Sequence, residues 1–213
     1  MIKKNKSTLI LGSLILLLPM LIGLILWDQL PEQIPSLWGI NGEVDGWSSR
    51  PFAVFALPCI MLAIHWLCAF MSTADPKSKN YHPSMIKLVL WICPMISLLI
   101  STLAYVTALG HSLNVEVLMP MFVGVLFVII GNLLPKCRQS YTMGIKLPWT
   151  LANEENWNKT HRLGGKVWVV GGVIILATAF LRIFWILIIA MLTMVLIPTI
   201  YSYLLYRKQQ KGE

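Results

Sequence analysis

His161 is the side chain with the clearest capacity for acid–base chemistry, because it shares a polar segment with Glu154 and Glu155. A histidine serves as a general base only beside a nucleophile, a metal ion or a positioned water. The sequence has no HExxH or GxSxG motif and no metal-ligand spacing. We therefore expect no catalytic residue, no metal site and no cofactor. A membrane enzyme acting on lipid or peptide is the least favoured alternative.

His65 is a second candidate, since it lies near the middle of an apolar run over residues 52–71. An ionisable residue within a membrane span is a functional candidate by default, and this one motivates the alternative of a small membrane transporter or channel. A lone neutral imidazole can also hydrogen-bond a neighbouring helix, and the same run holds no second histidine or carboxylate. We favour this structural interpretation. The four cysteines have no CxxC spacing, so neither a zinc site nor a disulfide framework is predicted.

The composition indicates an integral membrane protein. Hydrophobic residues make up 57% of the 213-residue chain and charged residues 12%, which leaves too little polar surface for a soluble domain of this size. In a soluble protein the net charge of +8 would suggest nucleic acid as a partner. Here the distribution of the basic residues between membrane spans is the better guide, and we expect no direct nucleic-acid binding.

Apolar runs of the right length predict an all-α integral membrane protein with six transmembrane helices. The first four spans are expected at residues 8–27, 52–71, 85–109 and 115–134. The apolar stretch 167–206 would form a helix of about 60 Å, twice the thickness of the bilayer core. We therefore predict two spans there, with a tight turn near Arg182.

Basic residues are concentrated in alternate loops. With both termini inside, the inside segments hold 15 Lys and Arg residues, whereas the outside segments hold only Arg50 and Arg182. We predict cytoplasmic termini and three regions: four spans in 1–134 with an extracytoplasmic loop at 28–51, a cytoplasmic segment at 135–166, and two spans with a basic tail at 167–213. The inside set is Lys3, Lys4, Lys6, Lys77, Lys79, Lys87, Lys136, Arg138, Lys146, Lys159, Arg162, Lys166, Arg207, Lys208 and Lys211.

The extracytoplasmic loop 28–51 is rich in proline and glycine, and its Asn41-Gly42 dipeptide favours a compact loop with a short hairpin. Trp38 and Trp47 are side chains of the kind that settle at a membrane interface. We favour this interpretation, although the same side chains could instead form a ligand-contacting surface, so the sequence leaves both open.

The cytoplasmic segment contains a predicted helix from Asn153 to Arg162. Asn153 is the expected N-cap, Glu155 and Lys159 form a favourable i, i+4 pair, and Gly164-Gly165 is expected to close the helix. We predict an amphipathic helix at the membrane surface, serving either as a structural elbow or as a docking surface for a cytoplasmic partner. One face of it is shared by Trp157, Thr160, His161 and Gly164.

Two stretches resemble known families. The run GNLLPKCRQSYTMGIKLPWTLANEENWNKTHRLGGK is similar to the signature of the SdpI family of bacterial immunity proteins, GN-x-LPK-x-R-x-N-x-x-GIRTPWTL followed by W-x-KTHR. The loop LPEQIPSLWGINGEVDGW resembles the small N-terminal domain of unknown function that often precedes it, with LP-x-x-IP-x-HWG and DGW. The chain departs from these patterns at Ser140, Lys146-Leu147 and Leu37, and Lys146 lacks the planar fork of the usual arginine.

The resemblance implies a multi-pass protein of the bacterial cell membrane that confers resistance to a secreted antimicrobial peptide toxin. In one branch of the family, signalling by recruitment of a cytoplasmic transcriptional repressor is added, so we rank immunity above regulation. The implied partners are membrane lipids, the toxin and that repressor. The candidate extracytoplasmic recognition residues are Trp38, Gly39, Asp45, Gly46 and Trp47. The candidate cytoplasmic residues are Asn132, Pro135, Lys136, Arg138, Tyr141, Gly144, Lys146, Pro148, Trp149, Thr150, Trp157, Lys159, Thr160, His161 and Arg162.

Overall fold

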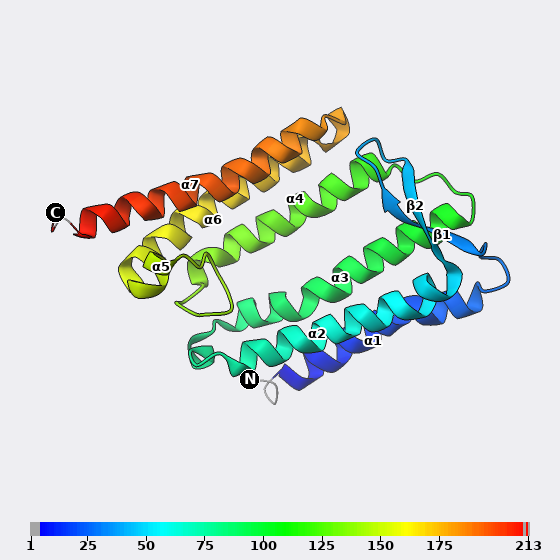
Figure 1. Ribbon diagram of the computed structural model, residues 1–213, viewed down its shortest axis with the longest axis horizontal. Coiled ribbons are helices and arrows are strands. Elements are labelled where there is room, and N and C mark those ends of the chain that lie inside the picture. Colours follow the sequence, from blue (N-terminus) through cyan, green and yellow to red (C-terminus); the bar gives the residue numbers. More distant parts are fainter. Residues whose placement is uncertain (1–4, 211, 213) are drawn as a thin grey trace. The chain divides into compact units, whose positions relative to one another are not determined.

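The computed structural model describes residues 5–210 and residue 212, and most of them are helical (Figure 1). Within this part of the chain, six helices are long and apolar enough to cross a membrane. The predicted class, an all-α membrane protein with six spans, is therefore confirmed. Lys3, Lys4 and Lys211, which belong to the inside set of basic residues, lie outside the described residues.

The first four spans and the last begin and end within a few residues of their predicted limits, whereas the helix of the fifth begins well before residue 167, at Glu154. A π-helical turn, Phe52–Ala56, leads into the second span, and short 3₁₀ turns occur at Ser78–Asn80, Leu134–Lys136 and Ala179–Leu181. The helices are α1 (Lys6–Ile25), α2 (Leu57–Ala74), α3 (Pro83–Ala108), α4 (Val115–Leu133), α5 (Pro148–Ala152), α6 (Glu154–Thr178) and α7 (Phe184–Gln210).

The chain forms two compact units. The first combines Met1–Thr73 with Lys87–Glu116, and the second combines Ala74–Ile86 with Val117–Glu213. The first unit therefore holds α1, α2 and most of α3, while the second holds the α2–α3 connection, most of α4, and α5 to α7.

In the first unit, strands β1 (Gln33–Trp38) and β2 (Val44–Ser49) form an antiparallel hairpin at the end of α1 that lies away from the N-terminus (Figure 1). Gly42 lies in the connecting turn with a positive φ of 74°, a conformation that glycine adopts readily. The hairpin predicted around Asn41-Gly42 is thus confirmed.

The base of this hairpin is fixed to the helices by a hydrophobic cluster and by Arg50. The cluster joins Leu30, Ile34 and Val54 to Tyr105 of α3. The Arg50 guanidinium donates to the carbonyl oxygens of Trp27 at 2.7 Å and Leu30 at 2.9 Å, and it lies 4.4 Å from the centroid of the Trp27 ring. These bonds satisfy carbonyl groups just beyond the end of α1, where the helix leaves them without partners.

Polar side chains inside the first unit are only partly satisfied. The Tyr105 hydroxyl donates to the Pro19 carbonyl at 3.1 Å. The buried hydroxyl groups of Ser97 and Ser101 have no partner among the described residues. His65 is fully buried beside Gly12, and the Leu9 carbonyl lies near its ring but outside hydrogen-bonding geometry. The hydrogen bond expected from His65 to a neighbouring helix is therefore not formed.

In the second unit, α6 and α7 form a helical hairpin with extensive mutual packing. The connection consists of the 3₁₀ turn Ala179–Leu181 and Arg182, whose positive φ of 55° reverses the chain before α7 begins. The turn predicted near Arg182 is confirmed, although it uses neither glycine nor proline.

Helices α4 and α6 approach each other closely through glycines. A Cβ atom placed on Gly165 would lie 2.7 Å from the Gly131 carbonyl oxygen, and one on Gly172 would lie 2.8 Å from the Gly124 carbonyl oxygen. Small residues permit such backbone contact between membrane helices, where packing rather than the hydrophobic effect drives association.

Candidate functional site

The signature segment, residues 131–166, lies in the second unit and leads directly into α6. The predicted N-cap is confirmed, because the Asn153 side chain accepts a hydrogen bond from the Asn156 N–H at 2.9 Å. The predicted helix end at Gly164-Gly165 is wrong, since α6 continues to Thr178. Neither glycine has a positive φ. Their missing side chains allow close packing against Ile145 and Gly131 instead.

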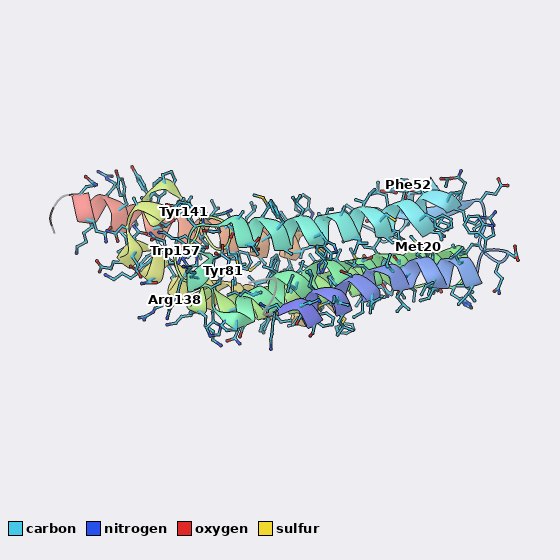
Figure 2. All side chains as sticks on the ribbon, turned by 90° about the horizontal axis from the view of Figure 1, so that it is seen from below. Met20, Phe52, Tyr81, Arg138, Tyr141 and Trp157 are labelled. Carbon is cyan, nitrogen blue, oxygen red and sulfur yellow. The ribbon has the colours of Figure 1, made fainter. Side chains whose placement is uncertain are left out.

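Trp157 does not lie at a membrane surface as predicted. It is fully buried, its indole N–H donates to the Cys137 carbonyl at 2.7 Å, and its ring stacks on His161 with centroids 4.1 Å apart. The predicted shared face of Trp157, Thr160, His161 and Gly164 is confirmed, because all four residues are buried. This face packs under the preceding loop, so the prediction of a separate amphipathic helix lying on the membrane is wrong. Figure 2 shows Trp157 inside the segment, with Arg138 directed outward.

His161 is held through both ring nitrogens. Its Nε2 accepts from the Ile145 N–H at 2.9 Å, so Nδ1 carries the proton and donates to the Trp157 carbonyl at 2.8 Å. Gly144 lies directly over this ring with a φ of 105°, and a Cβ there would lie 2.5 Å from Nε2. His161 and Gly144 thus act together to fix the loop to the first turns of α6.

The PWT motif connects the loop to α5 and α7. The Thr150 hydroxyl accepts from the Leu147 N–H at 2.9 Å and lies 2.9 Å from the Ile145 carbonyl, which closes the first turn of α5. The Trp149 indole donates to the Ser202 hydroxyl at 2.7 Å and stacks on Tyr206 at 5.8 Å between centroids. The motif therefore holds the segment against the end of the last span.

Asn156 and Ser202 form a buried polar network that the sequence analysis did not identify. The Asn156 amide donates to the Ser202 carbonyl at 3.0 Å, and its oxygen accepts from the hydroxyls of Ser202 at 2.8 Å and Thr160 at 3.0 Å. Each polar group is satisfied, as buried groups in a stable network must be. No local pattern predicts it, because the partners are separated by 46 positions.

Asp75 is a further residue that no motif in the sequence indicated. It is only 4% exposed, and its Oδ2 accepts from the backbone N–H groups of Tyr141 and Thr142, both at 2.9 Å, and from the Tyr81 hydroxyl at 2.5 Å. Oδ1 accepts from the Lys77 N–H at 2.7 Å. One carboxylate thus joins the α2–α3 connection to the signature loop. Tyr81 and Tyr141, one from each of these two segments, are labelled in Figure 2.

Electrostatics support an ionised Asp75. Burial alone would raise the pKa of this carboxyl, but the hydrogen bonds from Tyr81, Lys77, Thr142 and Tyr141 outweigh burial and hold its pKa below the usual value. Burial, together with the bond to Asp75, raises the pKa of Tyr81 to about 12, so the phenol remains a donor. Burial also raises the pKa of the Cys137 thiol to about 11.

Most of the remaining candidate residues of the segment face outward. Glu155 and Lys159 form the predicted ion pair at 2.6 Å. Lys146 reaches the Thr142 carbonyl at 3.3 Å. Among the described residues, no carboxylate lies within ion-pair distance of the other basic side chains of the segment. The exposed candidates are Asn132, Pro135, Lys136, Arg138, Tyr141, Gly144, Lys146, Pro148, Lys159 and Arg162.

The candidate extracytoplasmic residues all lie on the hairpin of the first unit. Trp38 packs against the hydrophobic cluster, whereas Trp47 is 57% exposed and Asp45 is exposed next to it in the strand. Gly39 and Gly46 allow close cross-strand contact, since a Cβ on Gly46 would lie 3.1 Å from the Leu37 Cβ. The two tryptophans therefore differ in exposure, and only Trp47 is free to contact a ligand at the surface.

The fold and the segment define a class, a multi-pass helical membrane protein. Across the described residues, no group of three or more His, Cys, Asp or Glu side chains gathers where it could hold a metal ion. Residues 136–202 match the model of the SdpI/YfhL protein family, and residues 14–62 match a domain of unknown function (DUF1648).

The chain belongs to the SdpI family. It is 32% identical over 214 residues to Immunity protein SdpI of Bacillus subtilis (strain 168), and the similarity covers 97% of both chains. The family resemblance noted in the sequence, including the N-terminal domain, is thus confirmed, and similarity to an immunity protein supports a role in membrane immunity. No solved structure matches the chain.

Proposed function

We propose that the protein makes its cell resistant to a secreted antimicrobial peptide, which it binds through the extracytoplasmic hairpin β1–β2. The observation that carries this proposal is the similarity to an immunity protein over nearly the whole chain. That similarity covers 97% of the relative's length, and six helices among the described residues are long and apolar enough to span a membrane.

The surface of the hairpin suggests the chemistry of the peptide. Leu37, Ile40 and Trp47 are each more than half exposed, although they are large apolar side chains. Residues 28–51 also hold four carboxylates and one cation, and this cation, Arg50, is occupied by carbonyl groups at the base of the hairpin. An apolar and acidic surface is complementary to a cationic amphipathic peptide.

Survival assays test the proposal. Cells that express the full chain are expected to survive a secreted cationic peptide that kills cells lacking it, and replacement of Trp47 by Ser should lower the protective effect about tenfold, because interface tryptophans carry a large share of binding energy. Trp185, exposed at the start of α7, provides the matched control in Trp185→Ser. Unchanged survival with and without the chain, across a panel of such peptides, would contradict the immunity proposal.

The finer proposal is that the peptide-bound protein recruits a cytoplasmic transcriptional repressor through its exposed basic side chains. Lys136, Arg138 and Arg162 support it, since none has a carboxylate partner among the described residues and each is exposed. Such charges favour rapid association with an acidic partner surface.

Transcript profiles after exposure to the peptide test this part separately. Wild-type cells are expected to show induced genes, and the triple variant Lys136→Gln, Arg138→Gln and Arg162→Gln should lose the induction while keeping resistance. An induction that persists in the triple variant contradicts recruitment through these residues and leaves immunity untouched.

We infer a non-enzymatic role from the same similarity. His161, the strongest candidate for a general base, has both ring nitrogens bonded within the chain. The transporter alternative rests on His65, which is buried without a partner among the described residues. Ion flux in liposomes that is lost in His65→Ala would favour that alternative.

A further inference from the structure

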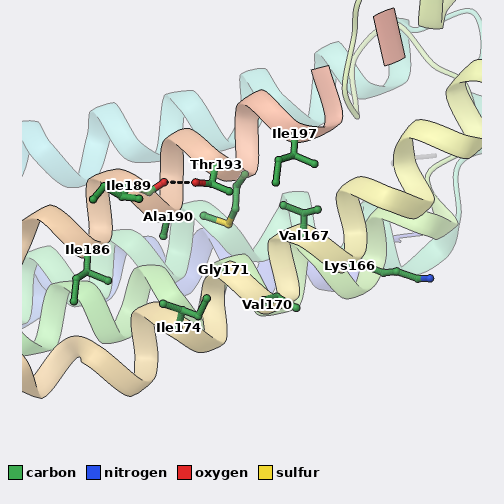
Figure 3. A pocket seen from close by; sticks show the side chains of 11 residues that line it. Lys166, Val167, Val170, Gly171, Ile174, Ile186, Ile189, Ala190, Thr193 and Ile197 are labelled. Carbon is green, nitrogen blue, oxygen red and sulfur yellow. Dashed lines mark hydrogen bonds between the residues drawn. The ribbon is translucent and has the colours of Figure 1, made fainter. Parts of the chain in front are cut away.

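A groove lies between α6 and α7 in the second unit, and the proposed function does not use it. Its cavity has a volume of about 410 Å³, within the range of small-molecule sites. Figure 3 shows apolar side chains of the two helices facing this space. They include Val167, Val170, Ile174, Ile186, Ala190 and Ile197.

The lining offers a ligand no hydrogen bond within the groove. Thr193 carries the one hydroxyl group among the lining side chains. This hydroxyl donates to the carbonyl of Ile189, one turn earlier in the same helix, at 2.7 Å (Figure 3), as threonines of membrane helices often do. The groove therefore suits a flexible hydrocarbon chain rather than a peptide or a polar metabolite.

Lys166 supplies the one charge at this groove. It lies at one end of the lining, and its ammonium points away from the apolar side chains (Figure 3). Among the described residues it has no carboxylate within ion-pair distance. A lysine near the end of a membrane span extends its charge toward the headgroup region, where a phosphate is the available counter-ion.

We propose that this groove binds one anionic phospholipid, with an acyl chain between α6 and α7 and the headgroup phosphate on the Lys166 ammonium. Charge complementarity at one end and a hydrocarbon lining along the rest select this occupant over a zwitterionic lipid or a helix of a second copy. The inference is independent of peptide immunity, since it uses no residue of the hairpin.

Native mass spectrometry of the full-length protein in micelles containing equal amounts of phosphatidylglycerol and phosphatidylcholine tests the proposal. One retained phosphatidylglycerol per chain is expected. Lys166→Gln should reduce its retention about tenfold, the effect of losing one charge-assisted contact. Val170→Trp should reduce it by filling the groove.

Two matched variants serve as controls. Lys208→Gln removes an exposed cation of α7 outside the groove, and Val173→Trp adds bulk at a site on α6 that is 51% exposed, close to the 58% of Val170, but does not line the groove. Both should retain the lipid as the wild type does. Equal retention of the two lipids, no retention of either, or no effect of Lys166→Gln would overturn the proposal. A lipid-free dimer of the wild type that dissociates in the Val170→Trp variant would also overturn the proposal, because a second copy would then occupy the groove.

Discussion

Asp75 shows how one carboxylate fixes an irregular loop. Replacing it with Asn keeps the shape but removes the charge and places an NH₂ group among donors from Tyr81, Tyr141 and Thr142. We expect Asp75→Asn to lower the free energy of unfolding by about 2–3 kcal/mol, the cost of leaving buried donors unsatisfied. Unfolding in detergent, followed by tryptophan fluorescence, measures the change, and exposed Glu154→Gln is the control.

The same contact makes stability depend on pH. Because the folded pKa of Asp75 lies below its usual value, its ionised form stabilises the fold above the ordinary carboxyl range, and this contribution is lost as the pH falls through the folded pKa. The difference in melting temperature between the wild type and Asp75→Asn should therefore shrink between pH 7 and pH 3. A difference that is constant over this range contradicts the role of the charge.

Gly144 has a left-handed backbone conformation, and the surrounding residues leave no room for a side chain at this position. Its φ is 105°, and an added Cβ would contact His161 and Trp157. Gly144→Ala is expected to destabilise the protein by about 2–4 kcal/mol, through backbone strain and overpacking together. Gly110→Ala is the matched control, because Gly110 has a φ of 86° with open space around it. Equal losses in the two variants would show that backbone strain alone is responsible.

At the scale of elements, the contact between α4 and α6 depends on glycines whose neighbours are backbone atoms. A side chain on Gly165 would meet the Gly131 carbonyl oxygen and Pro135, neither of which can rotate away. Gly165→Leu should destabilise the second unit by about 2–4 kcal/mol by separating the helices.

Thermal unfolding in detergent measures the effect of Gly165→Leu. The control is Val173→Leu, which places the same leucine side chain at an exposed position of α6 and should change the melting temperature by no more than a degree or two. Gly165→Leu with the stability of the wild type would mean that the close approach of α4 and α6 does not stabilise the fold.

At the scale of the whole molecule, an even number of spans, six, places both termini on the same side, and the distribution of basic residues predicts that this side is the cytoplasm. Alkaline phosphatase is active only outside the cytoplasm. Fusions after Gly42 are therefore expected to be active, and fusions after Lys79 and after Gln210 inactive. Activity after Lys79 would reverse the predicted orientation.

The sequence by itself determined the membrane class, the six spans, the reversal at Arg182, the hairpin at Asn41-Gly42 and the N-cap at Asn153. Each follows from a local signal: hydrophobic length set by the bilayer, turn chemistry, or a side chain that bonds its own backbone. The signature in the polar segment likewise indicated the family.

Only the tertiary structure decided what the polar segment does with its side chains. Local pattern could not show that Trp157 is buried rather than at an interface, because both environments suit an indole. It could not show that Gly164 and Gly165 serve packing rather than helix termination, or that Asp75 bonds a loop 66 positions away. Those roles depend on which segments meet in space, and contacts between residues far apart in the chain leave no periodic trace in the sequence.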